Sequence, residues 1–292
     1  MKSTRSAALV LAAAALMFSA MALFAKEASL RLPGPQVAFV RFLFGIATCA
    51  AVSLRVPLRA NNKIGLLMRG AFGGAAALCY FLAIEHLPVG LATLLNYTAP
   101  VFAALWAAAL LDEPLEPGSI LALALATLGV ALVATGGGGR VGGAPYLRWV
   151  LVGALSAVLS GAAVATIREV RRTDGSWEIF ASLCIAGALI TGAPALRSWV
   201  PPTQREWALL AAVGVTSVVA QVGFTWAMRY VRAAPAGVIA QLTPVGALAL
   251  GWLVHGDRIT PLSAAGAALT LTAVSWGAWR MSRATQVLPE DA

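Results

Sequence analysis

The sequence predicts an all-α membrane protein whose ten transmembrane helices form two inverted five-helix repeats. Three observations predict this fold: an apolar composition, ten separate apolar runs, and a repeat between the two halves. The 292 residues are 60% hydrophobic and only 11% charged, with a mean hydropathy of +0.82, whereas a soluble domain carries about 25% charged residues. An open sheet cannot satisfy its backbone in lipid, so the spanning elements are expected to be helices.

Ten apolar runs divide the chain, each close to the length that crosses about 30 Å of hydrocarbon as a helix. They cover residues 7–25, 36–54, 64–84, 88–110, 118–135, 147–167, 178–196, 207–228, 234–254 and 261–279. The first run follows Lys2 and Arg5 and also resembles a secretory signal peptide. We keep it as a membrane span, because without it the first half would be one span short of the second.

A glycine-rich segment near the midpoint separates five runs from five. It begins with the string Gly136 to Gly139 and continues with Gly142 and Gly143. We therefore expect a first five-helix repeat over residues 1–136, a linker over 137–146, a second inverted repeat over 147–283 and a tail over 284–292.

The distribution of Lys and Arg predicts the orientation, because short cytoplasmic loops carry the excess of positive charge. With the N-terminus in the cytoplasm, thirteen of the 21 basic residues fall on the cytoplasmic side, Arg69 among them. Seven fall on the other side, and Arg41 lies within a run. Both termini and the tail are therefore expected in the cytoplasm.

The stretch from Tyr80 to Trp106 has a counterpart 144 residues later. The matching positions pair Tyr80 with Phe224, Tyr97 with Gln241, and Pro100 with Pro244. Since each half has an odd number of spans, the second half is upside down relative to the first. Inverted repeats are typical of transporters, whose substrate site lies near the midplane between the repeats.

These features together resemble the EamA-type branch of the drug/metabolite transporter superfamily. The resemblance rests on the five-plus-five duplication, Arg41-Phe42 in the second run, the two proline-containing runs, and Glu113 and Asp257 before each closing run. Within this branch the chain is similar to the bacterial aromatic amino acid exporters called YddG. The resemblance implies helices around a central cavity, a bacterial inner-membrane location and export of small metabolites.

The placement of the carboxylates predicts an uncharged pathway. All twelve Asp and Glu residues lie at run ends or in loops, whereas proton-coupled exporters of cationic drugs usually keep an acid deep in the membrane. We therefore expect a cavity for neutral or zwitterionic solutes, such as aromatic or other neutral amino acids. These solutes would cross by alternating access, with facilitated diffusion as an option that needs no proton gradient.

Arg41 is a candidate substrate ligand, because a guanidinium can hold a substrate carboxylate by two hydrogen bonds. The favoured alternative is that Arg41 snorkels to the outer interface or pairs with Glu27 or Glu85.

Polar and aromatic residues inside the runs complete the predicted substrate-binding set, because amides can bind amino or carboxylate groups and rings can stack on an apolar solute. This set is Tyr80, Asn96, Tyr97, Gln221, Trp226, Gln241 and Arg41. Helix-to-helix hydrogen bonding is the alternative for the amides, and ordinary packing is the alternative for the aromatic rings. Pro100 and Pro244 are expected bend points, since each frees a backbone carbonyl one turn earlier.

Other classes of function have weaker support. A multidrug or nucleotide-sugar type carrier is the main alternative, although only Arg41 was expected to supply an inward charge. A lipid-modifying enzyme would need a cluster of acids, His or nucleophiles at membrane depth, and no such cluster is visible. We expect no enzymatic activity, no cofactor and no metal, a monomer, and the lipid bilayer and a small-molecule substrate rather than nucleic acid as partners.

Overall fold

The structure is a computed structural model that describes residues 2–111, 117–136, 144–171, 173–227, 239–257 and 259–284. All regular secondary structure in these ranges is helical, which confirms the all-α prediction. The glycine string after Gly136 and most of the predicted linker and tail lie outside the described residues, as do Asp112, Glu113 and Glu116.

Twelve helical segments follow one another along the described chain. They are α1 (Lys2–Ala28), α2 (Gly34–Ser53), α3 (Lys63–His86), α4 (Val89–Asn96), α5 (Ala99–Leu111), α6 (Pro117–Gly136), α7 (Ala144–Val170), α8 (Ser176–Arg197), α9 (Gln204–Ala227), α11 (Leu242–Leu250), the π-helix η1 (Gly251–His255) and α12 (Pro261–Ala284). Six of these, α1, α2, α3, α7, α8 and α9, are long and apolar enough to cross a membrane. The full count of ten spans, and their inverted arrangement, stays a prediction.

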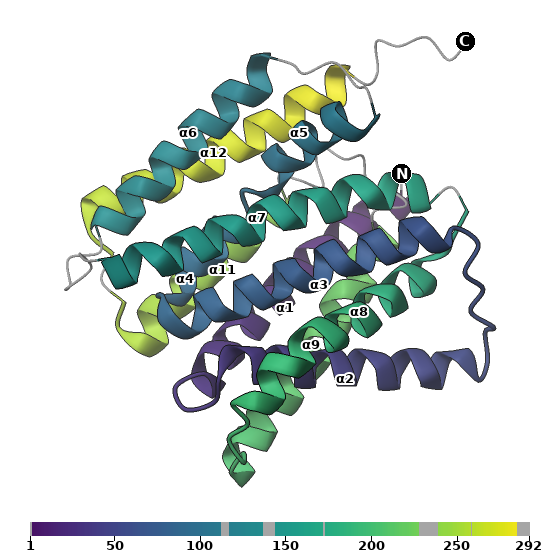
Figure 1. Cartoon of the computed structure of the whole chain (residues 1–292). Helices are drawn as coiled ribbons and strands as arrows, with labels where there is room; N and C mark the ends of the chain where they lie inside the picture. The colour runs from purple at the N-terminus through teal and green to yellow at the C-terminus, as the bar shows by residue number, and fades with distance from the viewer. Residues whose placement is uncertain are drawn as a thin grey trace.

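The neighbours of each helix follow a pattern that suits a duplicated chain. Helix α3 packs on α7 and α8, and α9 packs on α1 and α2. Helices α1, α2 and α3 correspond in order to α7, α8 and α9 of the second half. Replacing each helix by its counterpart therefore converts the neighbours of α3 into those of α9. Helices α6 and α12, the last of each half, lie side by side along one edge of the bundle (Figure 1).

Glycines allow several of these helices to approach closely. A Cβ atom at Gly74 of α3 would lie 2.8 Å from the Cα atom of Gly187 on α8, and one at Gly70 would lie 2.6 Å from the carbonyl oxygen of Ser182. A side chain at either position would therefore force α3 and α8 apart. The Gly70-x-x-x-Gly74 spacing is typical of such close helix contacts in membranes.

Both predicted bend points coincide with interruptions of a helix. The apolar run 88–110 is split into α4 and α5 by a turn at Tyr97 and Thr98, and Pro100 lies in the first turn of α5. Proline has no N–H to donate back to the preceding turn, which is why the helix restarts there. In the other half a turn at Gln241 precedes α11, and Pro244 lies three residues further on. That these points bend during transport stays a prediction.

Candidate functional site

Arg41 lies inside the bundle. Its side chain extends from α2 and is 9% exposed. Its Nε donates a hydrogen bond of 2.5 Å to the hydroxyl of Ser217 on α9. Its guanidinium carbon lies 5.0 Å from the ring centroid of Phe42 and 5.8 Å from that of Phe81. The favoured expectation that Arg41 snorkels to the outer interface is therefore wrong.

The two acids considered as partners of Arg41 are engaged elsewhere. Glu27 faces Arg205 and His255, at 3.6 Å and 3.5 Å. Glu85 accepts a hydrogen bond of 2.7 Å from the backbone N–H of Gly34. Neither pairing with Arg41 is therefore present.

Arg69 is a second buried arginine, which the sequence analysis had counted with the cytoplasmic loops. It lies on α3 and is 7% exposed. Its guanidinium covers Gly73, one turn further along the same helix, and its Nε has no hydrogen-bond partner within the described residues. Cys184 of α8 lies in the electrostatic field of both Arg41 and Arg69, so the two side chains converge on one region.

The interior next to α8 therefore holds two buried arginines, although the placement of the carboxylates predicted an uncharged pathway. Arg41 and Arg69 repel each other electrostatically, and the groups that act on them are Cys184, Tyr80 and Tyr97. The described carboxylates act on neither arginine and lie at helix ends or in loops. Arg69 was expected on the cytoplasmic side, and no signal in the sequence marks it as buried.

Two of the predicted tyrosines lie next to this charge. Tyr80 is buried on α3, and its hydroxyl shares a hydrogen bond of 2.9 Å with the hydroxyl of Thr93 on α4. Tyr97, at the break between α4 and α5, interacts through its hydroxyl with Thr243 of α11. Both phenol groups lie in the electrostatic field of Arg41. The interruptions of the two halves thus meet near the arginines.

Gln241 adds another buried donor at the interruption before α11. It is 6% exposed, and its side-chain nitrogen has no partner among the described residues. The neighbouring Thr243 is tied to α1, because its hydroxyl donates to the carbonyl of Ala15 and its own carbonyl accepts from Ser19. Gln241 is therefore held on a fixed segment with its side-chain nitrogen unused.

The other three predicted residues lie apart from this group. Asn96 donates hydrogen bonds of 3.0 Å and 3.1 Å to Ser156 and Ser160 on α7, as expected for a residue that joins two helices. Gln221 is partly buried on α9. Trp226 is 41% exposed, which does not favour a role in the interior.

We call Arg41, Arg69, Tyr80, Tyr97 and Gln241 the central donor cluster. Arginine side chains only donate hydrogen bonds, and an amide nitrogen likewise donates. A buried donor without an acceptor is costly, so the cluster is suited to a ligand that brings acceptor atoms. Within the described residues no group of three or more His, Cys, Asp and Glu side chains could hold a metal ion.

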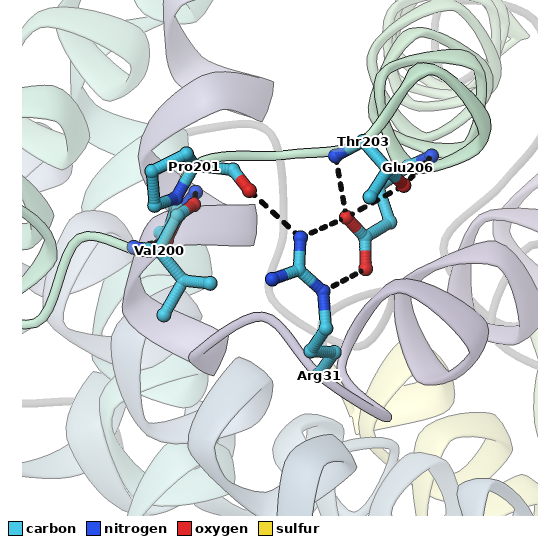
Figure 2. A network of polar contacts seen from close by, with 6 residues as sticks. Arg31, Val200, Pro201, Thr203 and Glu206 are labelled. Atoms are coloured by element: carbon cyan, nitrogen blue, oxygen red, sulfur yellow. Dashed lines mark hydrogen bonds and ion pairs between the residues drawn. The ribbon is translucent and has the colours of Figure 1, made fainter.

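One end of the bundle is held together by a polar network around Arg31, which Figure 2 shows. We call it the Arg31 end; it includes the α1–α2 loop, residues 29–33, and the α8–α9 loop, residues 198–203. Arg31 donates from Nε to Glu206 at 2.6 Å, from Nη2 to the second oxygen of the same carboxylate, and to the carbonyl of Pro201 at 2.7 Å. The same carboxylate accepts from the N–H and hydroxyl of Thr203, which forms a capping box at the start of α9.

Lys26 and Asp257 also lie at the Arg31 end. The Lys26 ammonium donates to the carbonyl oxygens of Ile84, Glu85 and Leu87 where α3 ends. Burial raises the pKa of the Asp257 carboxyl, although His255 and Lys26 act in the opposite direction. Thr260, rather than the nearby Asp257, caps the start of α12, because its hydroxyl accepts a hydrogen bond from the N–H of Ser263.

The opposite end is joined by Asp174. Its carboxylate accepts hydrogen bonds of 2.8 Å and 2.9 Å from the backbone N–H groups of Asn61 and Asn62, and one from the Thr173 hydroxyl. Burial alone would raise the pKa of the Asp174 carboxyl, but these hydrogen bonds hold it below its ordinary value. They tie the α2–α3 loop to the loop before α8.

Comparisons with known proteins agree with this architecture. A model of the EamA-like transporter family matches the chain twice, over residues 5–135 and 147–276. The Pseudopaline exporter CntI of Pseudomonas aeruginosa strain UCBPP-PA14 is 30% identical over 273 residues, which is 92% of this chain and 94% of that protein. An uncharacterized transporter of Archaeoglobus fulgidus is 28% identical and covers 84% of this chain and 86% of its own length.

More distant similarities extend the comparison. Human solute carrier family 35 member E4 is 27% identical over 75% of this chain and 63% of its own length. One solved crystal structure of a protein, 22% identical, superposes with a TM-score of 0.67 over 95% of this chain and 99% of the other, which shows the fold alone. The closer resemblance to YddG exporters stays a prediction. The family model covers most of the chain in two copies, and the chain is therefore an integral, multi-pass membrane transporter that belongs to the EamA-like family of the drug/metabolite transporter superfamily.

Proposed function

We propose that this protein exports small amphipathic metabolites built like amino acids, each with at least one carboxylate. The central donor cluster is the observation that carries the proposal. Its arginines and amide would hold the carboxylate, and the rings of Tyr80, Phe42 and Phe81 would contact the apolar part of the solute. Neutral amino acids, aromatic ones included, belong to this class.

The transport cycle would alternate access to the cluster from the two membrane faces. The Lys and Arg asymmetry assigns the Arg31 end to the periplasm of a bacterial inner membrane, with both chain termini in the cytoplasm. The interruptions at Pro100 and Pro244 adjoin the cluster and would serve as the bend points. Replacing either proline by alanine should slow transport at unchanged expression; equal rates would argue against bending there.

Coupling to protons is not expected from the described residues. The carboxylates of this part of the chain lie at helix ends or in loops, whereas proton exchange with substrate typically uses an acid at membrane depth. Transport would then follow the gradient of the solute itself.

A second candidate is a carrier of phosphorylated solutes, such as a nucleotide-sugar type carrier. The sequence argument against it was that only Arg41 could face inward, and the buried Arg69 removes that argument.

Efflux from proteoliposomes tests the proposal. Vesicles containing the full chain would be loaded with labelled phenylalanine, leucine, glutamate or glucose 6-phosphate, with and without a pH gradient. Protein-dependent efflux of at least one amino acid without a pH gradient is expected, and Arg41→Gln should abolish it. Efflux of the sugar phosphate alone would favour the second candidate, and a strict requirement for the pH gradient would contradict facilitated diffusion.

A further inference from the structure

We infer that the central donor cluster binds a solute with two carboxylates, one held by Arg41 and the other by Arg69. The inference rests on the proposed function and specifies its substrate class: an amphipathic dicarboxylate rather than a simple amino acid. It follows from the geometry of the two arginines and from the charges around them.

Arg41 is prepared to hold one carboxylate. Its Nε is occupied by Ser217, which leaves the edge formed by the two terminal nitrogens available for a two-point hydrogen bond. The rings of Phe42 and Phe81 lie close to the guanidinium and restrict its motion. Arg41 is seven residues into α2, about 10 Å along the helix from Gly34.

Arg69 reaches the same region from the opposite end of the bundle. It is six residues into α3, about 9 Å along the helix from Lys63, and its guanidinium extends over Gly73 toward the other end of that helix. Its Nε has no partner in the described part of the chain. This buried nitrogen is therefore available to an acceptor atom of a bound solute.

The two buried positive charges of Arg41 and Arg69 favour a solute with two negative groups. The arginines repel each other, and no described carboxylate compensates either of them. An uncompensated buried cation is unfavourable. A solute with one carboxylate would neutralise only one arginine, whereas a dicarboxylate would neutralise both.

Two separate carboxylates suit the geometry better than one phosphate. The Arg41 guanidinium is fixed between α2, α3 and α9 by Ser217 and the two rings, whereas the Arg69 guanidinium lies against Gly73 and Leu183 at the contact of α3 with α8. Two donors anchored on different helix contacts match two acceptor groups on one molecule. The phenyl rings of Phe42 and Phe81 beside Arg41 favour an organic body over an inorganic ion.

A matched series of probes tests this inference: phenylalaninol has no carboxylate, phenylalanine has one and N-(carboxymethyl)phenylalanine has two. Binding to the purified full chain would be measured by calorimetry in detergent, and transport by proteoliposome efflux. We expect N-(carboxymethyl)phenylalanine to bind at least about tenfold more tightly than phenylalanine, and phenylalaninol more weakly than both. Inorganic phosphate should not compete at equal concentration.

Three variants show whether the arginine pair causes this preference. Arg69→Gln should reduce the advantage of the dicarboxylate to about twofold or less. Gly73→Ala, which keeps the charge but occupies the space under the Arg69 guanidinium, should reduce it in the same direction. Arg148→Gln removes an exposed arginine of α7 and should leave the preference unchanged.

The outcomes separate this inference from the proposed function. Equal affinity for the one- and two-carboxylate probes, with phenylalanine efflux intact, would overturn the inference and leave the proposed function standing. Phosphate competition as strong as that of the dicarboxylate, or no binding of any probe, would also overturn it. Absence of efflux for every amino acid and derivative would contradict the proposed function itself.

Discussion

Replacing Glu206 by glutamine is expected to loosen the Arg31 end. The carboxylate of Glu206 accepts from Arg31 at both oxygens and also from Thr203. Glutamine can still complete the capping box at the start of α9, but it loses the charge, and one of its two terminal atoms is a donor. The substitution therefore removes the ion pair and one hydrogen bond while leaving the helix start intact.

The size of the effect follows from exposure. The side chain of Arg31 is 46% exposed and that of Glu206 is 12% exposed, so the ion pair contributes about 1 kcal/mol at most. The lost hydrogen bond adds about 1 kcal/mol. The closed state of the Arg31 end should lose about 1–2 kcal/mol of stability relative to the open state. The open state should then be roughly 5- to 30-fold more populated. The two hydrogen bonds between Gln36 and Val200 remain, so the end should not separate completely.

Cysteine labelling measures this population. Ser29 is buried beside the network, and Ser29→Cys, in a chain whose native cysteines are replaced by alanine, reports access from that side. A membrane-impermeant maleimide should label it roughly 5- to 30-fold faster in Glu206→Gln. The control is Glu178→Gln, which changes another first-turn acid, that of α8. Equal labelling in wild type and Glu206→Gln, or the same increase in Glu178→Gln, would refute the reasoning.

Two further predictions concern single polar contacts. Asn96→Ala removes two hydrogen bonds to α7 and should lower the thermal stability of the detergent-solubilised protein by about 1 kcal/mol, with the KM of transport unchanged; a raised KM at normal stability would instead give Asn96 a substrate role. Because the folded-state pKa of Asp174 is lowered, its stabilisation is complete above its unfolded-state pKa of about 4 and is lost as pH falls through the folded-state value. Asp174→Asn should therefore lower the melting temperature at pH 7 but make progressively less difference as the pH falls below about 4; a gap that widened on acidification would contradict this assignment.

The elements of the fold were accessible from sequence because they depend on composition and on local breaks. Apolar runs specify spanning helices, and a proline at a fixed distance from a turn specifies where a helix restarts. Bend points at Pro100 and Pro244 were predicted for this reason, within runs expected to be continuous, and the structure shows helix interruptions next to both prolines. The capping box from Thr203 to Glu206 was not predicted, although it follows the Thr-x-x-Glu pattern.

The direction of a long side chain was not accessible from sequence. Arg69 lies near the start of α3, where an arginine commonly snorkels to the interface; only the close packing of α3 on α8 turns it inward. Asn96 was equally suited to a solute or to another helix, and the choice depends on the two serines that α7 places opposite it. Such choices depend on the register of neighbouring helices, which a single sequence does not specify.

Protection of Cys184 by a solute tests the central claim most directly, because this thiol lies in the field of both arginines. In a chain with Cys49→Ala and Cys79→Ala, the rate of Cys184 alkylation by N-ethylmaleimide would be measured with and without N-(carboxymethyl)phenylalanine. At ten times the Kd of this solute, alkylation should slow by about tenfold, and Arg69→Gln should remove the protection at the same concentration. Alkylation at the same rate with and without the solute would contradict binding at the central donor cluster.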